Sequence, residues 1–282
     1  MYSINRDVSA DTEKSLTKIA LCVEYDGHLY SGWQRQKHSK SVQGVLETVL
    51  SGIANQPIEL HCAGRTDSGV HATGQIVHFN FNNNEGHQRQ LKAWVEGSNA
   101  RLPDDISVRW ATEVSNDFHA RFSATARTYR YIIHNSRSRS ALLSNRVARV
   151  SSKLDIKAIQ SCLGHFLGEQ DFSTVRAANC QSNSCFRNIH RLEASQKGEF
   201  ILIEICANAF LYHMVRNIAG ILIAVGKQQL SSAQVLQLLE NKDRTQAPAT
   251  APASGLYLVD VLYPEKFELP HVVSGPWPWQ LQ

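Results

Sequence analysis

Residues 58–81 read IELHCAGRTDSGVHATGQIVHFNF, two partly apolar stretches on either side of a glycine-rich polar segment. Residues 58–63 and 75–81 contribute Ile, Leu, Val and Phe between polar residues, a pattern typical of strands. Glycine between them allows the chain to turn sharply and a ligand to approach the backbone closely. The stretch therefore predicts two strands joined by a loop that presents polar side chains.

The sequence on either side of this stretch completes a unit of mixed structure. The elements predicted from apolar spacing and turn signals are strands at 18–25 and 106–114, and helices at 42–53, capped by Ser41, and at 89–99. Residues 18–115 thus follow the order β-α-β-β-α-β and form the N-terminal half, which carries the glycine-rich loop.

Residues 116–264 repeat this order with one extra helix. The elements predicted there are strands at 127–134, 186–195, 200–208 and 256–263, and helices at 155–167, 210–226 and 233–240. Two such units predict an α+β fold of two ferredoxin-like (RRM-like) βαββαβ halves related by a pseudo-two-fold axis. We expect a mainly antiparallel sheet with helices on one side and a cleft between the halves.

The ends of the chain are expected to be peripheral. Residues 1–17 are predicted to form a disordered N-terminal tail, residues 265–282 a C-terminal tail with two tryptophans, and residues 82–87 a loop.

Composition excludes several classes of protein. With 43% hydrophobic and 19% charged residues, the 282-residue chain is neither a disordered acidic protein nor a coiled coil. No apolar run approaches the roughly 20 residues of a membrane span, and the best candidate, 218–225, closely follows Arg216. The polar N-terminus lacks the apolar segment of an export signal, so we expect a cytoplasmic protein without a membrane partner.

Cysteines and histidines give no metal signature. The six cysteines contain no C-x-x-C pair, and the 12 histidines form no H-E-x-x-H motif. We therefore expect reduced thiols and no bound metal.

Positive charge is concentrated in one segment. The formal net charge is only +4, yet residues 118–154 hold eight basic residues and no acidic one, which leaves 21 basic and 25 acidic residues elsewhere. The eight are Arg121, Arg127, Arg130, Arg137, Arg139, Arg146, Arg149 and Lys153. The segment predicts polyanion binding, because arginine suits bidentate phosphate contact and base stacking. A solvated basic face without a partner is the alternative.

The loop motif GRTDSGVH at 64–71 presents a single carboxylate, that of Asp67. Asp67 is a candidate nucleophile, although Asp-Ser-Gly is also ordinary turn chemistry. Arg65 beside it strengthens the functional interpretation. The sequence has no Walker A loop, G-x-G-x-x-G fingerprint or G-x-S-x-G elbow, which argues against nucleotide hydrolysis and serine acyl transfer.

Arg216 is the only formally charged residue between Ile205 and Gly226. A guanidinium in such apolar surroundings needs an anion, since an unpaired buried charge costs several kcal/mol. Asp67 is the predicted partner, and an arginine within about 4 to 6 Å lowers a carboxyl pKa by roughly 1 to 3 and keeps the group ionised. The alternative is that Arg216 reaches solvent past small residues.

The predicted strand at 127–134 places Arg127, Tyr129 and Tyr131 on one face, because side chains alternate along a strand. A cation beside aromatic rings suits a stacked base and its phosphate. Two ordinary half-buried tyrosines are the alternative, but their place in the acid-free segment favours RNA.

Together, these motifs resemble the tRNA pseudouridine synthase A family. The similarity rests on GRTDSGVH at 64–71, RTYRY at 127–131, MVRN at 214–217 and GLYL at 255–258, with YDG at 25–27, GWQ at 32–34 and HARF at 119–122. The resemblance implies that uridine is isomerised to pseudouridine in the anticodon stem-loop of tRNA, at positions 38, 39 and 40. It also implies a homodimer and no cofactor.

The resemblance also implies roles for individual residues. Asp67 matches the catalytic aspartate, Arg65 an arginine that assists base flipping, and Tyr129 a tyrosine that stacks on the target uracil. Arg216 matches the basic residue that pairs with the aspartate, and Leu256 lines the uracil pocket. The segments that match RNA contacts contain Phe118, His119, Ala120, Arg121, Phe122, Asn179, Cys180, Gln181, Ser182 and Asn183. From the basic segment we add Arg127, Arg130, Arg137 and Arg139 as predicted RNA contacts.

The chemistry explains why one ionised carboxylate suffices. Moving the C1′ bond from N1 to C5 of uracil is an isomerisation that needs no metal, nicotinamide or ATP. Asp67 acts at C1′ in the preferred form and at uracil C6 in the rival form, after the nucleotide has been extruded at a cost of a few kcal/mol. A non-catalytic RNA-binding module and a carboxylate-dependent N-glycosidase remain alternatives, although glycosidases usually use a second carboxylate.

Overall fold

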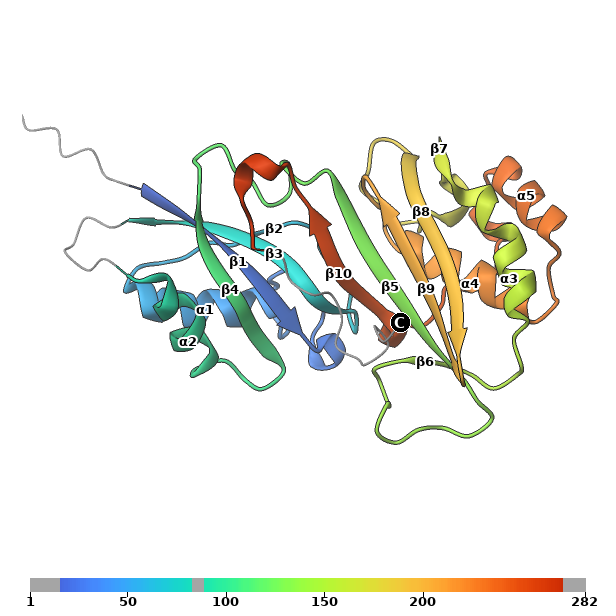
Figure 1. Ribbon diagram of the computed structural model, residues 1–282, viewed down its shortest axis with the longest axis horizontal. Coiled ribbons are helices and arrows are strands. Elements are labelled where there is room, and N and C mark those ends of the chain that lie inside the picture. The colour runs from blue at the N-terminus through green and yellow to red at the C-terminus, as the bar shows by residue number, and fades with distance from the viewer. Residues whose placement is uncertain (1–15, 83–88, 271–282) are drawn as a thin grey trace, which may run out of the picture.

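Ten strands form one continuous sheet in the computed structural model, which describes residues 16–82 and 89–270 (Figure 1). The strands are β1 Leu16–Tyr25, β2 His61–Cys62, β3 His71–Asn82, β4 Ile106–Val114, β5 Ala126–Asn135, β6 Ala148–Val150, β7 Gly168–Asp171, β8 Phe186–Lys197, β9 Phe200–Ala207 and β10 Leu256–Leu262. Their order across the sheet is β4-β1-β3-β10-β5-β9-β8-β7, while β2 pairs with β3 and β6 with β5.

Helices lie beside both ends of this sheet (Figure 1). The α-helices are α1 Val42–Ala54, α2 Leu91–Asn99, α3 Ile156–Cys162, α4 Met214–Gly226 and α5 Ser232–Asn241. The 3-10 helices are Gly27–Leu29, Leu163–Phe166, Ser173–Val175, Arg244–Gln246, Ala253–Gly255 and Glu265–Phe267. Helices α1 and α2 lie near β1 and β4, and α3, α4 and α5 lie near β7, β8 and β9. The α+β class and the mostly antiparallel sheet are confirmed.

The last strand, β10, joins the two ends of the sheet. It runs parallel to β3, where Tyr257 is opposite His71, and antiparallel to β5, where Leu256 is opposite Tyr131. Gly74 allows the close approach of β10, because a Cβ there would lie 2.4 Å from the carbonyl oxygen of Val259. Gly74 therefore serves the contact between β3 and β10.

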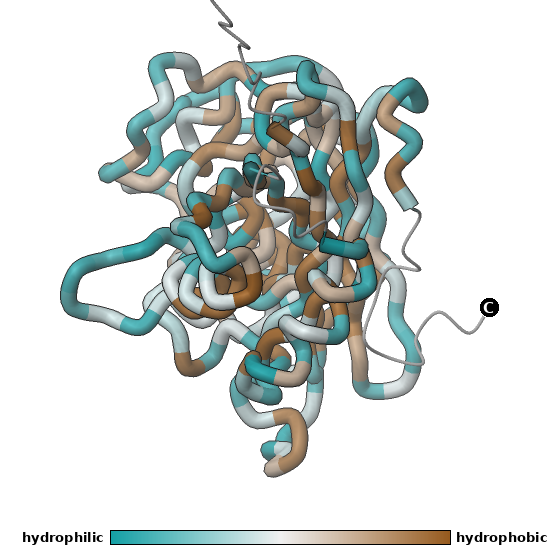
Figure 2. The backbone as a smooth tube through the Cα atoms, turned by 90° about the vertical axis from the view of Figure 1, so that its left-hand side faces the viewer, coloured by the Kyte–Doolittle hydropathy of each residue, from teal (hydrophilic) through white to brown (hydrophobic). Residues whose placement is uncertain are grey.

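The sheet carries apolar side chains on both faces. In β10, Leu256 and Leu258 belong to the main hydrophobic core, which also contains the buried faces of the five helices. Tyr257 instead joins a smaller cluster with Ile132 and Val147. Because side chains alternate along a strand, the smaller cluster covers the opposite face. Figure 2 shows hydrophobic segments in the interior and hydrophilic loops at the periphery.

Local signals account for several element ends. The Ser41 side chain accepts a hydrogen bond from Gly44 N and caps α1 as predicted. Ser231 and Gln234 form a capping box at α5. Gly198, with φ of 59°, lies in the turn between β8 and β9, where the hairpin was expected.

Other predicted boundaries were wrong. The strand expected at 58–63 is reduced to His61–Cys62, because the amides of Ile58 and Leu60 bond instead to the side chains of Ser51 and Glu47 in α1. The strand expected at 75–81 begins earlier, at His71, so the loop motif ends inside a strand.

The helices also differ from the prediction. The helix expected at 210–226 begins only at Met214, because His213 has a left-handed backbone, with φ of 60°. The helix expected at 155–167 is α-helical only to Cys162 and continues as a 3-10 helix to Phe166. Strands β6 and β7 were not predicted.

Most of the predicted tails and the loop at 82–87 lie outside the described residues, as do both tryptophans of the C-terminal tail. Within the part of the chain that is described, β1 begins at Leu16, inside the predicted N-terminal tail. Across these same residues, every helix is too short or too polar to cross a bilayer.

Candidate active site

The glycine-rich motif forms a loop between β2 and β3, which we call the Asp67 loop (residues 64–70). Three hydrogen bonds anchor it, two to its backbone and one to a side chain. Trp33 N donates to the Thr66 carbonyl oxygen at 3.0 Å, and the Tyr25 hydroxyl contacts Thr66 Oγ1 at 2.7 Å. The Gln75 side-chain amide donates to the Gly64 carbonyl oxygen at 2.7 Å. The loop is therefore held in one conformation from β1, β3 and the segment before α1.

Two glycines outside the loop let the chain pack against it. Gly32 has φ of 96°, and a Cβ there would lie 2.7 Å from the Thr66 carbonyl oxygen. A Cβ on Gly27 would lie 1.9 Å from the Val70 carbonyl oxygen. The YDG and GWQ motifs thus shape the backbone under the loop, since no side chain fits at either glycine.

The contact predicted between Asp67 and Arg216 is confirmed. Nη1 of Arg216, in the first turn of α4, lies 3.9 Å from Oδ2 of Asp67. The two side chains are 16% and 24% exposed, so the ion pair is largely buried yet reaches the surface. Arg216 does not extend to solvent past small residues, because its Nε donates to the Ala251 carbonyl oxygen at 2.9 Å.

A histidine that sequence reasoning missed also contacts this carboxylate. Nε2 of His213 lies 3.4 Å from Oδ2 of Asp67, closer than Arg216 does. His213 was expected inside a helix, where its direction would follow the helical period, and its left-handed backbone turns it toward Asp67 instead. Its position three residues before the lone arginine was the one available signal.

Burial dominates the electrostatics of Asp67. Desolvation raises the pKa of its carboxyl, and the nearby His213 and Arg216 offset this only in part. Arg216 lowers the pKa of Asp67 as predicted, but burial outweighs this effect, so the pKa lies above its usual value. Burial, together with the charge of Arg216, lowers the pKa of His213, against the opposing effect of Asp67. The imidazole is thus favoured in its neutral form.

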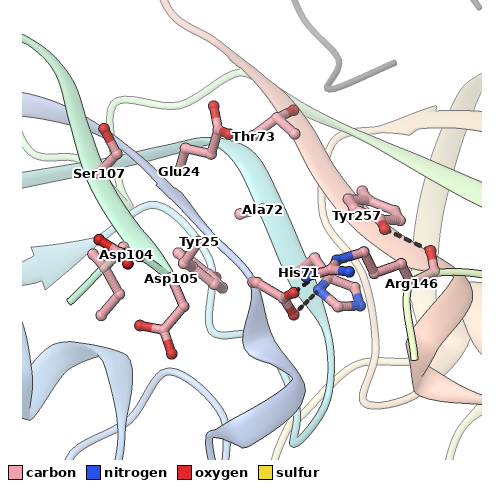
Figure 3. A pocket seen from close by; sticks show the side chains of 12 residues that line it. Glu24, Tyr25, His71, Ala72, Thr73, Asp104, Asp105, Ser107, Arg146 and Tyr257 are labelled. Carbon is pink, nitrogen blue, oxygen red and sulfur yellow. Dashed lines mark hydrogen bonds and ion pairs between the residues drawn. The ribbon is translucent and has the colours of Figure 1, made fainter. Parts of the chain in front are cut away.

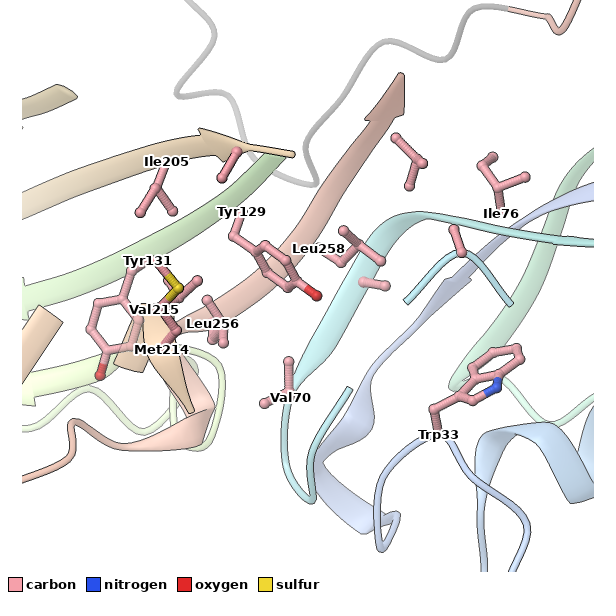
Figure 4. Packing of buried hydrophobic residues seen from close by; sticks show 14 of the residues in the cluster. Trp33, Val70, Ile76, Tyr129, Tyr131, Ile205, Met214, Val215, Leu256 and Leu258 are labelled. Carbon is pink, nitrogen blue, oxygen red and sulfur yellow. The ribbon is translucent and has the colours of Figure 1, made fainter. Parts of the chain in front are cut away.

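Tyr129 and Leu256 lie on the sheet next to the Asp67 loop. Tyr129 projects from β5 with Leu256 and Leu258 of β10 beside it (Figure 4). Its hydroxyl lies close to Gly64, because a Cβ on that glycine would be 3.7 Å away. Burial and the nearby Asp67 raise the pKa of Tyr129, which therefore stays a neutral phenol. Phe210 packs edge-on against its ring, with centroids 5.0 Å apart.

Arg65 is exposed at the loop tip, and no hydrogen bond or ion pair of its side chain appears among residues 16–82 and 89–270. Its guanidinium is therefore available to an external ligand, as a base-flipping role requires.

Several arginines of the basic segment donate hydrogen bonds to other groups of the protein. Arg127 donates to the carbonyl oxygens of Ala63, Arg121, Ala124 and Asn208. Arg127 thus links the backbone at residues 63, 121–124 and 208, and its predicted contact with RNA stays a prediction. Other arginines of the segment are also engaged.

Arg130 donates twice to Glu204, at 3.1 and 2.6 Å, and its side chain is only 12% exposed. Glu204 also pairs with Arg191, so one carboxylate serves two arginines, and the predicted role of Arg130 in RNA binding stays a prediction. Arg149 donates to the carbonyl oxygens of Ser136 and Arg137. Arg121, Arg137 and Arg139 are exposed.

The segment 118–122 divides into buried and exposed residues. Phe118 and Ala120 are fully buried, so their side chains support the segment, and their predicted RNA contacts stay a prediction. His119 is half-buried, whereas Arg121 and Phe122 are exposed. The Arg121 guanidinium lies over the Phe122 ring at 5.6 Å.

The segment 179–183 lies near the turn that precedes α4. Cys180 Sγ accepts from Tyr212 N at 3.4 Å, next to His213. Arg176 donates to the carbonyl oxygens of Cys180 and Ser182. The exposed residues of this segment are Asn179, Gln181 and Asn183.

Two cavities lie away from Asp67. One, of about 280 Å³, is lined by Asp26, His71, Arg146 and residues of β1, β3, β4 and β10 (Figure 3). The other, of about 310 Å³, lies between α3, α4 and α5. The predicted cleft between the halves stays a prediction. Among residues 16–82 and 89–270, no group of three or more His, Cys, Asp or Glu side chains is placed to hold a metal ion.

Comparison with known proteins decides the family. A family model described as tRNA pseudouridine synthase matches residues 21–123 and 163–264, which include Asp67, Arg216 and Leu256. The chain belongs to the tRNA pseudouridine synthase family. The resemblance noted from its motifs is thereby confirmed.

Two relatives in this family cover nearly the whole chain. A tRNA pseudouridine synthase A of Aliivibrio fischeri (strain MJ11) is 54% identical over 259 residues, 92% of this chain and 97% of that protein. One of Hydrogenovibrio crunogenus is 52% identical over 265 residues, 94% of this chain and 100% of that protein. A solved Cbf5-Nop10-Gar1 complex aligns at a TM-score of 0.34 and 10% identity, over 85% of this chain and 48% of that chain, a likeness too low to carry an argument.

Proposed function

We propose that this protein isomerises uridine to pseudouridine at positions 38, 39 and 40 in the anticodon stem-loop of tRNA, with Asp67 as its catalytic carboxylate. Isomerisation of uridine in tRNA follows from membership of the family. The observation that carries the role of Asp67 is its position in an anchored loop, beside the histidine that precedes α4 and an arginine of α4, and still 24% exposed.

The reaction needs one carboxylate near the sugar of an extruded nucleotide. As the N1–C1′ bond breaks and its electron pair stays on uracil, the preferred form has Asp67 bond to C1′ or stabilise its positive charge. Uracil then turns, C5 bonds to C1′ as the carboxylate leaves, C5 loses its proton and N1 gains one. Arg216 beside the carboxylate favours its ionised form, which nucleophilic attack requires.

Three side chains are proposed to hold the target nucleotide. Arg65, exposed and unpaired within the described residues, fills the space that the extruded base leaves. Tyr129 stacks on uracil, and its neutral hydroxyl is available to assist removal of the C5 proton. Leu256, opposite Tyr131 in the sheet, forms an apolar wall of the uracil pocket.

The RNA-binding surface is proposed to be formed mainly by the accessible side chains of segments 118–154 and 179–183. These are the exposed or half-exposed residues His119, Arg121, Phe122, Arg137, Arg139, Asn179, Cys180, Gln181, Ser182 and Asn183. The buried or internally bonded residues Phe118, Ala120, Arg127 and Arg130 are proposed to lie behind this surface. Exposed arginines without an internal carboxylate suit phosphate, and Phe122 suits base stacking.

Architecture and assembly complete the proposal. Each half, 18–115 and 116–264, has one ferredoxin-like strand order, β4-β1-β3-β2 and β10-β5-β9-β8, which supports a duplicated unit with a pseudo-two-fold axis. We further propose that the protein is a cytoplasmic homodimer that works without a cofactor.

The test is tritium release from an anticodon stem-loop that contains uridine labelled at C5. Asp67→Asn should bind the stem-loop nearly normally and release no tritium, because an amide does not replace a carboxylate nucleophile. Substantial release by this variant would contradict the catalytic assignment. Product analysis separates the alternatives, since an N-glycosidase frees uracil and a binding module leaves uridine unchanged.

A further inference from the structure

His213 and Arg216 both contact Oδ2 of Asp67, and His213 lies closer to this oxygen. Its Nε2 is 3.4 Å from Asp67 Oδ2, compared with 3.9 Å for Arg216 Nη1. Arg216 also donates to the Ala251 carbonyl oxygen, whereas Asp67 is the only polar partner of the His213 side chain among residues 16–82 and 89–270. Asp67 is therefore one of two partners of the Arg216 side chain but the single polar partner of the imidazole within the described residues.

The backbone of His213 directs it to this position. The residue caps the N-terminus of α4 in the left-handed region, with φ of 60° and ψ of 6°, but its side chain caps no helical amide. A residue other than glycine persists in this region only when its surroundings hold it, and histidine is among the side chains enriched there. Tyr212 stacks on the imidazole, with centroids 4.0 Å apart and planes at 27°, which fixes the ring.

The two oxygens of Asp67 are used differently. Oδ2 contacts both His213 and Arg216, whereas Oδ1 makes no hydrogen bond or ion pair within the described residues. Because the side chains of Asp67 and His213 are 24% and 23% exposed, the pair lies within reach of a bound nucleotide. One oxygen is thus held by the protein and the other is open to a ligand.

We propose that His213 is a positioning residue that donates Nε2–H to Oδ2 of Asp67, so that Oδ1 faces the target nucleotide. The proposal rests on the catalytic role of Asp67 proposed above. A neutral imidazole, which burial favours here, still carries the one N–H that this bond requires. Holding one oxygen fixes the carboxylate plane, and such orientation raises the rate of the chemical step more than it raises affinity.

Two matched variants separate the hydrogen bond from the shape of the ring. His213→Phe keeps an aromatic ring over Tyr212 and removes the donor, whereas His213→Gln places an amide N–H near the position of Nε2. Neither phenylalanine nor glutamine favours a left-handed backbone as histidine does, so both variants bear the same backbone strain at this position. We expect His213→Phe to lower the single-turnover rate of tritium release roughly 10- to 100-fold, and His213→Gln to recover most of the loss. Stem-loop dissociation constants should stay within about threefold of wild type for both variants.

Three results would overturn the proposal: a wild-type rate for His213→Phe, no recovery in His213→Gln, or an affinity loss as large as the rate loss. Asp67→Asn in the same assay keeps the two assignments apart. If Asp67→Asn is active, the catalytic role of Asp67 fails, whereas if it is inactive and His213→Phe is not slowed, only the role of His213 fails. Should His213→Phe not fold, His213→Asn provides the comparison, because asparagine tolerates the left-handed backbone and is too short to reach Asp67. A rate for His213→Asn equal to that of His213→Gln then overturns the proposal.

Discussion

The structure contains two clusters in which one aspartate contacts one histidine and one arginine. The members are Asp67, His213 and Arg216 in the Asp67 cluster, and Asp26, His71 and Arg146 in the Asp26 cluster. The carboxyl pKa is raised in the Asp67 cluster and lowered to about 2 in the Asp26 cluster. The same three residue types are therefore found with opposite shifts of the carboxyl pKa.

Contact geometry explains the difference. Asp26 Oδ1 lies 3.0 Å from His71 and accepts from His28 N at 3.1 Å, while Oδ2 accepts from Arg146 at 3.0 Å (Figure 3). The close contact with His71 is the largest cause of the lowered pKa, and it outweighs burial. In the Asp67 cluster, contacts of 3.4 and 3.9 Å to a single oxygen do not outweigh burial. A carboxylate with protein partners on both oxygens stabilises the fold. A carboxylate with one oxygen free of such partners keeps its reactivity.

Replacing the two arginines should separate a catalytic cluster from a structural one. Arg216→Met should lower the single-turnover rate of tritium release roughly 100-fold, because the carboxylate loses a nearby cation, with little change in affinity. Arg146→Met should change the rate less than about threefold. Equal losses of rate and affinity in Arg216→Met would identify Arg216 as a phosphate contact instead.

The Asp26 cluster should contribute more to stability. Asp26→Asn should lower the free energy of unfolding by about 1 to 2 kcal/mol at pH 7, measured by urea denaturation. The pKa of Asp26 falls from an ordinary 3.8 to about 2, so its contribution is present above pH 4 and is lost as the pH falls through 2. The difference between variant and wild type should shrink over that range, and a constant difference would argue against the ionised carboxylate.

The Asp67 cluster should respond to the corresponding change with the opposite sign. Folding raises the pKa of Asp67, so its ionised form opposes folding at pH values above the unfolded pKa. Asp67→Asn should be as stable as wild type or more stable, by up to about 1 kcal/mol at pH 7, and the gain should vanish in acid. A loss of stability at pH 7 would show that the ionised carboxylate supports the fold.

The smallest expected difference concerns the salt dependence of stem-loop binding in variants of Arg139 and Arg146. Arg146 is 49% exposed but paired with Asp26, whereas Arg139 is exposed and has no carboxylate partner within the described residues. Arg139→Gln should reduce the slope of log affinity against log salt by about 1, and Arg146→Met should leave it unchanged. A reduced slope in Arg146→Met would place its charge on RNA.

Local sequence signals predicted much of the fold. Period-two alternation located the long strands, and Ser41 marked the start of α1, because both features depend on neighbouring residues. The strand at 58–63 was overestimated because the amides of Ile58 and Leu60 bond to side chains of α1, which are distant in sequence. Strand β7 carries no alternation that the sequence could reveal, since only its antiparallel partner β8 defines it.

The sequence predicted a site contact correctly where a charged residue in apolar surroundings required an oppositely charged partner. Arg216 is the lone charge in an apolar segment, and that isolation pointed to Asp67 before any geometry was known. A count of charges did not reveal the hydrogen bonds of Arg127 to the Ala63 carbonyl oxygen and of Arg130 to Glu204, because both partners are distant in sequence.

Composition and spacing alone established that the protein mixes helices and strands, which loop carries the carboxylate, and which arginine accompanies it. The left-handed turn at His213, the direction of the Asp67 pKa shift and the pairing of individual arginines depend on distances between segments far apart in the chain. Burial and contact distance set the free energy of each charge, and neither quantity exists until the segments have packed together.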